Sequence, residues 1–289
     1  MTLEHFLCAS DTDWDTKGVP RALVLTLKQT LRRLWLPPLG QPKRRAVPHL
    51  SVQDVAMDEF LGGPGIRGGW ITEIYGESAT GKTQWLLQMA LSAQNPKNFG
   101  GLESDCLFIN TEPPFPAERL QAMCLGQPHA HLDRVHIISA FDQPAFWQLP
   151  EKMAAYLRHR PGTKLILMDS IAAPFRGAED TKSDAYKTRS QQLWRWHSEV
   201  LKLVRRHHLI MVVTNQVTSV KDEHGVMQLA PTLGLSWSTM VQQRFCLTKK
   251  EVQGETVRHI KRIFGPLVPS DANETMRYQI TTKGITFVQ

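Results

Sequence analysis

The sequence predicts an α/β fold in which a mostly parallel central sheet is flanked by helices. Three observations lead to this prediction. Short segments that are apolar throughout alternate with longer helical segments, a glycine-containing turn joins the first of them to an apolar helix, and after residue 239 the pattern changes to strands and turns. Strands that are apolar on both faces are typical of a parallel sheet covered by helices.

The first 48 residues differ from the rest of the chain. Leucines at positions 23, 27, 31 and 34 predict one helix from Pro20 to Trp35. Four prolines surround the basic run after it and predict an extended linker. We therefore expect a short N-terminal helical segment and linker over residues 1–48, and a single core over residues 49–289.

Five apolar strands are expected in the core, at residues 70–75, 106–110, 134–139, 164–169 and 209–215, with helices at about 82–94, 144–160 and 184–208. At the end of the chain, Lys283 and Gly284 separate two strand-like segments and predict a hairpin. Trp194 and Trp196 are two residues apart and cannot share one helical face. We expect one of them in the core and the other in contact with a partner.

The composition is that of a globular protein with a basic excess. The chain has 289 residues, of which 42% are hydrophobic, and a formal net charge of +7. A basic excess favours anionic partners such as nucleic acid, although each basic cluster taken alone is more simply a solvated face. No stretch approaches the ~18 unbroken apolar residues of a membrane helix, so no membrane partner is expected. The four cysteines lack a zinc-binding spacing.

The segment GESATGKT, residues 76–83, matches the phosphate-binding pattern G-x-x-x-x-G-K-[ST] at every fixed position. It follows a predicted strand and opens a predicted helix, which is the setting that this motif requires. Its glycines permit a turn whose backbone amides face a phosphate, at the positive end of the helix. The residues expected to bind ATP are Gly76, Glu77, Ser78, Ala79, Thr80, Gly81, Lys82 and Thr83.

Within this loop, Lys82 should reach the β and γ phosphates, and the Thr83 hydroxyl should bind Mg²⁺. A nucleotide site of this kind also needs an acid at the end of another strand. Asp169 ends the strand LILMD and is the expected second magnesium ligand, with a capped turn as the simpler alternative. Glu112 ends the strand CLFINTE and is the candidate for orienting water. From the residues alone, Glu112 is equally well a surface carboxylate.

Several segments together resemble the RecA family of recombinases on its eukaryotic side. They are the lead-in LSVQDVAMDEFLGGPGIRGGWITEIYGESATGKTQ, followed by FINTEPPFPAERL, LMDSIAAPFR, VVTNQVTS and LAPTLGLSWSTMVQQRFCL, and they cover roughly residues 49–289. The resemblance implies a RecA-type ATPase core. It assigns catalytic roles to Glu112, Lys82 and Gln216, and adds Gln84 to the ATP-binding residues.

Within the family, DSIAAPFR, GGLESDCLFINTE and APTLGLSW resemble the paralogue branch, in particular the third X-ray repair cross-complementing group and its fungal counterparts. This resemblance implies an ATP- and Mg²⁺-dependent accessory subunit of homologous recombination and double-strand break repair, acting in the nucleus. Its implied partners are another recombinase paralogue, in a heterodimer or larger complex, and single-stranded or branched DNA. The main recombinase is a further candidate partner. Pro113 and Pro114 stiffen the loop after Glu112 and favour weak turnover.

The same resemblance puts DNA-binding loops at about 176–190 and 217–234. Cations that could meet DNA phosphates are Arg176, Lys182, Lys187 and Arg189 in the first loop and Lys221 in the second. A surface loop without a ligand is the simpler alternative for both. Two other functions stay open: a structural adaptor whose ATP site only stabilises a protein–protein interface, and a different RecA-fold DNA-dependent ATPase.

Overall fold

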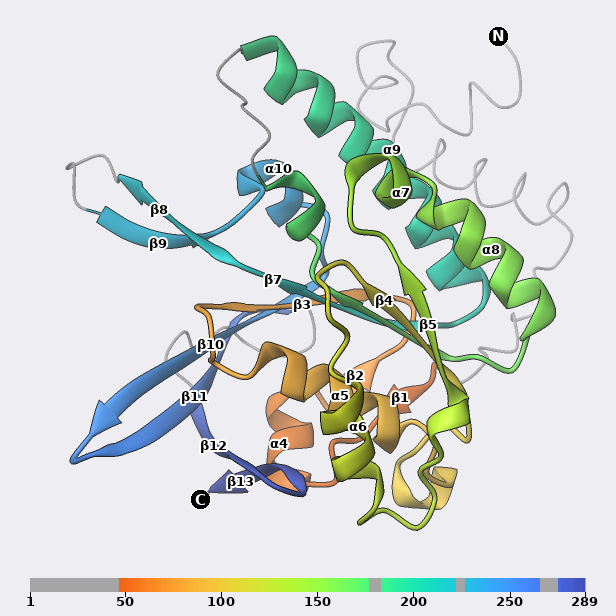
Figure 1. Ribbon diagram of the computed structural model, residues 1–289, viewed down its shortest axis with the longest axis vertical. Helices are drawn as coiled ribbons and strands as arrows, with labels where there is room; N and C mark the ends of the chain where they lie inside the picture. The colour runs from red at the N-terminus through yellow and green to blue at the C-terminus, as the bar shows by residue number, and fades with distance from the viewer. Residues whose placement is uncertain (1–46, 177–182, 222–226, 266–274, 289) are drawn as a thin grey trace, which may run out of the picture. The chain divides into compact units, whose positions relative to one another are not determined.

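The computed structural model describes residues 47–176, 183–221, 227–265 and 275–288 (Figure 1). The helix expected from Pro20 to Trp35 lies outside the described residues. The strands of the main sheet are β3 (Ile71–Gly76), β4 (Cys106–Asn110), β5 (Val135–Ser139), β6 (Leu165–Asp169), β7 (Ile210–Asn215), β10 (Gln243–Val252), β11 (Glu255–Phe264), β12 (Thr275–Thr281) and β13 (Gly284–Val288).

This nine-stranded sheet has the order β13-β12-β11-β10-β3-β7-β6-β4-β5. Neighbours from β10 to β5 pair in parallel, and β10 to β13 pair antiparallel. Each of the five expected apolar strands is present within one residue of its predicted bounds, and the antiparallel strands follow them in the chain. The expected α/β class with a mostly parallel sheet and C-terminal antiparallel strands is therefore confirmed.

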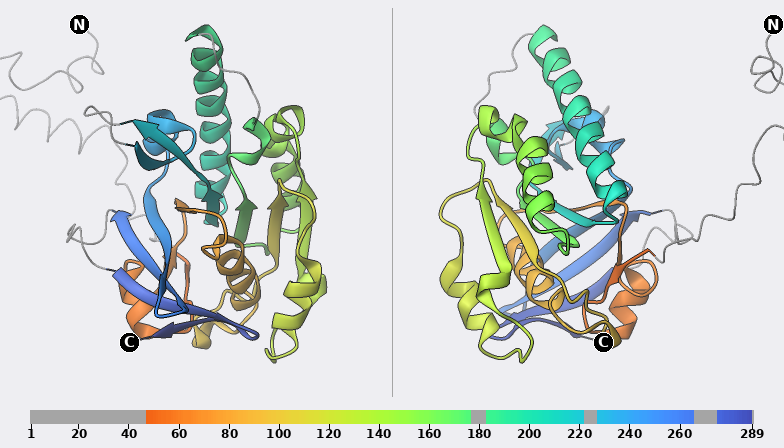
Figure 2. Two further views of the ribbon diagram at one scale, coloured as in Figure 1. Left: turned by 60° about the vertical axis from the view of Figure 1, so that its left-hand side comes forward. Right: turned by 90° about the vertical axis from the view of Figure 1, so that its right-hand side faces the viewer.

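Helices cover both faces of the sheet (Figures 1 and 2). On one face lie α4 (Val55–Phe60), α5 (Lys82–Ser92) and α6 (Ala117–Cys124). On the other lie α7 (Gln143–Trp147), α8 (Leu149–His159), α9 (Ser183–Arg206) and α10 (Gly234–Ser238). None of these helices, within the parts of the chain that the structure describes, is long and apolar enough to cross a membrane.

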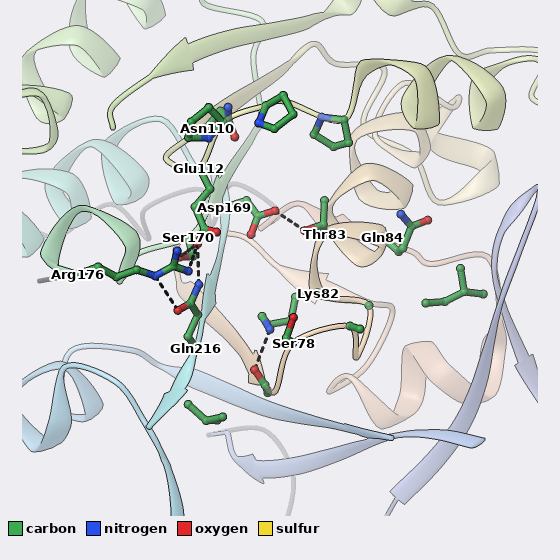
Figure 3. Close-up of a pocket in the computed structure, with 18 residues that line it drawn as sticks. Ser78, Lys82, Thr83, Gln84, Asn110, Glu112, Asp169, Ser170, Arg176 and Gln216 are labelled. Carbon is green, nitrogen blue, oxygen red and sulfur yellow. Dashed lines mark hydrogen bonds and ion pairs between the residues drawn. The ribbon is translucent and has the colours of Figure 1, made fainter. Parts of the chain in front are cut away.

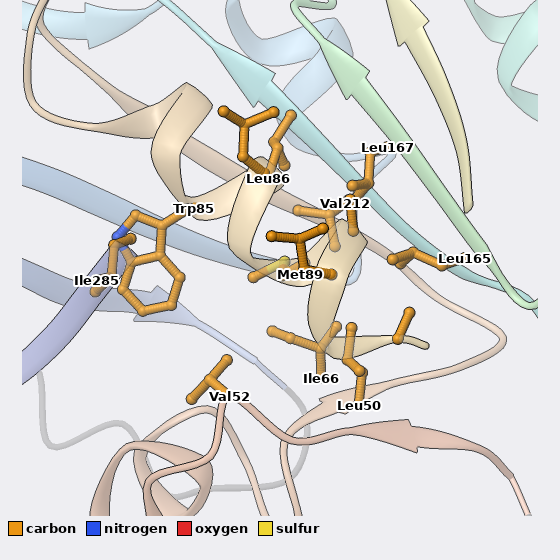
Figure 4. Packing of buried hydrophobic residues seen from close by; sticks show 14 of the residues in the cluster. Leu50, Val52, Ile66, Trp85, Leu86, Met89, Leu165, Leu167, Val212 and Ile285 are labelled. Atoms are coloured by element: carbon orange, nitrogen blue, oxygen red, sulfur yellow. The ribbon is translucent and has the colours of Figure 1, made fainter. Parts of the chain in front are cut away.

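Alternate residues of each buried strand belong to different cores. Leu165 and Leu167 of β6 pack with α5 in the first core, whereas Ile166 and Met168 pack under α8 and α9 in the second. Figure 4 shows the first core around Trp85. Because every side chain of these strands is covered, the apolar runs in the sequence are continuous rather than alternating.

A short strand pair leads into the main sheet. β1 (His49–Leu50) pairs antiparallel with β2 (Ile66–Arg67), and α4 lies between them in the chain. The Asp54 side chain caps α4 by accepting a hydrogen bond from the Met57 amide at 2.8 Å. Three single-turn helices, η1 (Lys97–Phe99), η2 (Leu132–Arg134) and η3 (Ala173–Phe175), complete the connections described here.

Two segments that were expected to be loops contain regular structure. From residue 183 the chain is helical, because no glycine or proline interrupts the sequence of α9. Most of the second expected loop is a hairpin of β8 (Val217–Lys221) and β9 (Met227–Pro231), which lies apart from the main sheet. The prediction of loops over these residues was therefore wrong where α9, β8 and β9 occupy them.

The two tryptophans of α9 face opposite environments. Trp196 is 3% exposed, its ring stacks on Phe146 at a centroid distance of 4.6 Å, and its Nε1 donates to the Phe146 carbonyl oxygen. Trp194 is 61% exposed. The expectation that one belongs to the core is confirmed for Trp196, and contact of Trp194 with a partner stays a prediction.

We expect Trp196→Ala to lower the free energy of unfolding by about 3–5 kcal/mol, because it removes a buried ring and leaves a cavity. The matched change Trp194→Ala on the same helix should stay within about 0.5 kcal/mol. Urea unfolding followed by circular dichroism measures both. Equal losses for the two variants would contradict the burial described here.

Candidate nucleotide-binding site

The turn between β3 and α5 has the backbone that a phosphate-binding loop requires. Gly81 is in the left-handed region with φ of 107°, and Ala79 also has a positive φ of 62°. A Cβ on Gly81 would lie 2.8 Å from the Ile280 side chain, and one on Gly76 would lie 2.3 Å from the Leu247 carbonyl oxygen. Gly81 is therefore required by its backbone conformation, and Gly76 by the lack of space beside the Leu247 carbonyl oxygen.

Lys82, the first residue of α5, points back over this loop. Its Nζ donates to the carbonyl oxygens of Gly76 and Glu77, each at 2.8 Å. Burial lowers the pKa of Lys82, and the negative charges of Asp169 and Glu112 oppose that shift. The ammonium group is thus held at the phosphate end of the loop and beside the acidic residues that the sequence singled out.

Asp169, at the end of β6, faces the start of α5. Its Oδ2 accepts a hydrogen bond from the Thr83 hydroxyl and its Oδ1 accepts one from the Thr214 hydroxyl, both at 2.5 Å. Burial raises the pKa of Asp169 above its usual range, although these two hydroxyls stabilise the charged form. The peptide bond from Asp169 to Ser170 is cis.

Thr83 and Asp169 fit a magnesium ion. Hydroxyl and carboxylate oxygens are the ligands that Mg²⁺ prefers, and a carboxylate shielded from water gains from a nearby cation. Across the described ranges, no group of three or more His, Cys, Asp or Glu side chains could hold a metal ion. A magnesium ion at Thr83 and Asp169 would therefore take its other ligands from phosphates and water.

Glu112 lies on the opposite side of the pocket, two residues after β4. Its Oε1 accepts hydrogen bonds from Gln216 Nε2 at 2.7 Å, from Arg176 Nη2 at 2.8 Å and from the Ser170 hydroxyl at 3.2 Å. Arg176 Nε also donates to Gln216 Oε1 at 3.1 Å. Figure 3 shows these side chains meeting from the ends of β4, β6 and β7 and, for Arg176, from the residue after η3.

A buried polar network holds the strand end that carries Gln216. Asn215 Nδ2 donates to Glu73 Oε1 at 2.7 Å, and the Asn215 side-chain oxygen accepts from the Gln216 amide at 2.8 Å. Glu73 also pairs with Arg244 and accepts from Trp237 Nε1. Burial raises the pKa of Glu73, while Arg244 and the other donors oppose the shift. Glu73 thereby links β3, which leads to the phosphate loop, with the end of β7.

Strand β12 supports the phosphate loop from the other side. The Tyr278 hydroxyl donates to the Thr80 carbonyl oxygen at 2.6 Å, and Ile280 packs against Gly81. On α6, Arg119 donates from Nε to Gln84 Oε1 at 2.8 Å and from its other nitrogens to backbone oxygens at the end of β12. The C-terminal strands therefore fix both the loop and the position of Gln84.

These residues enclose a cavity of about 780 Å³. The expected residues that line it are Gly76, Ser78, Ala79, Gly81, Lys82, Thr83, Gln84, Glu112, Asp169 and Gln216, together with Arg176. Two expected residues, Glu77 and Thr80, do not line the cavity. They hold the loop together instead, because the buried Thr80 side chain donates to the Glu77 carbonyl oxygen at 2.9 Å.

Sequence reasoning missed several residues of the site. Thr214 and Ser170 contact Asp169 and Glu112, and the only signal for them was their place in the sequence, directly after Asp169 for Ser170 and two residues before Gln216 for Thr214. Tyr278 and Ile280 come from a strand near the end of the chain. No local pattern marks a residue nearly 200 positions from the loop it supports.

The candidate DNA-contact residues are not gathered in loops. Arg176 points into the nucleotide pocket, and Lys187 and Arg189 lie on α9. Lys221 is the last residue of β8, and Lys182 lies outside the described residues. The expected loop placement is therefore wrong for Lys187 and Arg189, because the helix continues through them, and their contact with DNA stays a prediction.

The chain is similar to known proteins of DNA repair and recombination. Residues 43–288 match the Rad51 family model. The chain is 28% identical to the DNA repair protein XRCC3 homolog of Arabidopsis thaliana, over 78% of this chain and 90% of that protein. It is also 28% identical to DNA repair protein XRCC3 of Bos taurus, over 82% of this chain and 74% of that protein.

An archaeal relative extends the comparison. The DNA repair and recombination protein RadA of Metallosphaera sedula is 31% identical, over 76% of this chain and 70% of the relative. The match to the family model spans the phosphate loop, the strands whose ends carry the acidic residues, and the C-terminal strands that support the loop. The chain belongs to the Rad51 family.

Proposed function

We propose that the chain is an ATP-binding accessory subunit of homologous recombination and double-strand break repair. It acts in the nucleus on single-stranded or branched DNA, together with another recombinase paralogue, and the main recombinase is a further candidate partner. The proposal of ATP binding rests on the pocket in which Lys82, Thr83 and Asp169 lie together at the phosphate loop. The names of the relatives, which refer to DNA repair and recombination, support the DNA part.

The chemistry that this pocket supports is hydrolysis of ATP to ADP and phosphate. Loop amides and Lys82 would hold the phosphates, and Mg²⁺ held by Thr83 and Asp169 would neutralise part of their charge. Glu112 is the acceptor for a proton of the attacking water, since it lines the same cavity. Gln216, hydrogen-bonded to Glu112, would help to hold that carboxylate in place.

A second function is favoured by the environment of Glu112. Its Oε1 accepts from three side chains, and two prolines follow it. Both features favour slow turnover. An adaptor that binds ATP to stabilise a protein–protein interface would need the phosphate loop but little hydrolysis. The exposed Trp194 and the exposed Leu235 of the adjacent α10 are candidates for such an interface.

Lys82→Ala should weaken Mg·ATP binding by about 10- to 100-fold, because it removes a charge-assisted hydrogen bond to phosphate. Lys97→Ala removes a lysine whose side chain is 75% exposed, outside the pocket, and should leave the affinity unchanged. Isothermal titration calorimetry measures both variants. Full affinity in Lys82→Ala would rule out the proposed ATP site.

Lys82→Arg distinguishes the two functions, because it keeps the charge but changes the geometry at the phosphates. Co-purification with the paralogue partner and repair of double-strand breaks are the readouts. If both survive in Lys82→Arg and in Lys82→Ala, ATP is dispensable and both functions are rejected, since the adaptor also binds ATP. Loss of repair with partner binding intact would favour turnover over an adaptor role.

Asp169→Asn should abolish the dependence of ATP affinity on magnesium while the fold is kept. The amide preserves the size of the side chain but is a poor ligand for Mg²⁺. The measured quantity is the ratio of ATP affinities with Mg²⁺ and with a chelator, which should approach one. Asp133→Asn changes an exposed carboxylate outside the pocket and should behave like the parent chain. An unchanged ratio in Asp169→Asn would remove Asp169 from the magnesium site.

A further inference from the structure

Arg176 joins two residues of the nucleotide site that the sequence placed on different strands. Its Nη2 lies 2.8 Å from Glu112 Oε1, and its Nε lies 3.1 Å from Gln216 Oε1. Gln216 Nε2 closes the triangle at 2.7 Å from the same Glu112 oxygen. A planar guanidinium with fixed donor directions is suited to such a double contact.

The base of the Arg176 side chain is fixed while its tip is open to solvent. The Arg176 amide donates to the Ala173 carbonyl oxygen at 3.2 Å, and the preceding Phe175 is 6% exposed and packs on Phe146. By contrast, the Arg176 side chain is 55% exposed and that of Glu112 is 39% exposed. An anion in solution can therefore approach the guanidinium without any change in the core.

The three donors restrict what Glu112 can do. A carboxylate oxygen has two lone pairs, and Oε1 already accepts from Arg176, Gln216 and Ser170. While these donors stay, Oε1 is closed to water, and they also fix the direction in which the other carboxylate oxygen, Oε2, can meet a water molecule. Of the three donors, Arg176 is the one with a charge and the one that an external anion can remove.

We propose that Arg176 is a positioning residue that restrains Glu112, and that a DNA phosphate relieves the restraint by competing for the guanidinium. The inference rests on the proposed function, because it assumes that Glu112 serves ATP turnover. Arginine binds phosphate through two parallel hydrogen bonds, so a phosphodiester is an effective competitor for a carboxylate. DNA binding and release of Glu112 then become one event at one side chain.

The exposure of the Arg176–Glu112 ion pair limits how much the restraint can change ATP turnover. Ion pairs between exposed side chains are weak, so the restraint should change turnover by no more than about fivefold. A weak restraint is also one that a single phosphate contact can overcome. The alternative role for Arg176, direct stabilisation of the charge on the transferred phosphate, predicts the opposite sign, since its loss would slow turnover.

The test compares ATP turnover by the full-length chain with and without single-stranded oligothymidylate, measured as release of labelled phosphate at saturating Mg·ATP. Arg176→Ala should raise DNA-free turnover by about three- to fivefold and bring the ratio of turnover with and without DNA close to one. Arg176→Lys should lie between the parent and Arg176→Ala, because an ammonium group lacks the fork that contacts both Glu112 and Gln216.

Two further variants locate the effect. Arg205→Ala removes an exposed arginine at the end of α9, away from the pocket, and should match the parent with and without DNA. Glu112→Gln combined with Arg176→Ala should abolish the rise in DNA-free turnover, because that rise requires the Glu112 carboxylate. A double variant as active as Arg176→Ala would show that Arg176 acts through another group, and the proposal would be wrong.

Every result for Arg176→Ala decides the question. If Arg176→Ala turns over ATP more slowly or at the same rate without DNA, Arg176 does not restrain Glu112. If turnover by Arg176→Ala still responds to DNA, a DNA phosphate does not act by competing for the Arg176 guanidinium. If turnover of the parent lies below detection, its appearance in Arg176→Ala supports the proposal and its absence rejects it. Calorimetry on the parent distinguishes failure of the proposed function from failure of this inference. Absence of Mg·ATP binding would reject the proposed function. Normal binding with unaltered turnover in Arg176→Ala would reject only this inference.

Discussion

The tight turn between β3 and α5 is the constraint on which the rest of the site depends. It brings the loop and the Lys82 ammonium together, and it requires Gly81 in the left-handed region, where its Cα packs beside Ile280. The Tyr278 hydroxyl holds the loop from the same strand as Ile280. The antiparallel end of the sheet is thus part of the nucleotide site.

The parallel register brings the polar side chains to this turn. Asn110 of β4 is level with Asp169 of β6, so Glu112, two residues further on, extends past the edge of the sheet toward the pocket. Gln216 follows the end of β7, whose Asn215 side chain holds the Gln216 amide. Buried hydrophobic strands fix this register, because a slip of one residue would exchange the side chains of the two cores. The chemistry at the edge therefore depends on the packing of residues that never contact the nucleotide.

The sequence was most informative where function and local structure coincide. Apolar runs marked the buried strands, and the phosphate-loop pattern marked Lys82 and Thr83, because both signals lie within a few consecutive residues. The contacts that escaped prediction join distant segments, such as Arg176 with Glu112 and Tyr278 with Thr80. Where family resemblance suggested a loop at Lys187, the uninterrupted helical sequence had already indicated α9, and the local signal was the better guide.

Two ion pairs of the same chemistry show how environment assigns different roles to similar residues. Glu73 and Arg244 have side chains that are 0% and 6% exposed, and further donors surround the carboxylate. Removing one partner would leave a buried charge, so this pair is a permanent link between strands. Glu112 and Arg176 are 39% and 55% exposed, so water can replace either partner, and phosphate can replace Glu112, at little cost. A site that must respond to a ligand needs an exposed, replaceable pair such as Glu112 and Arg176. The strands that carry such a pair are held in place by a buried pair such as Glu73 and Arg244.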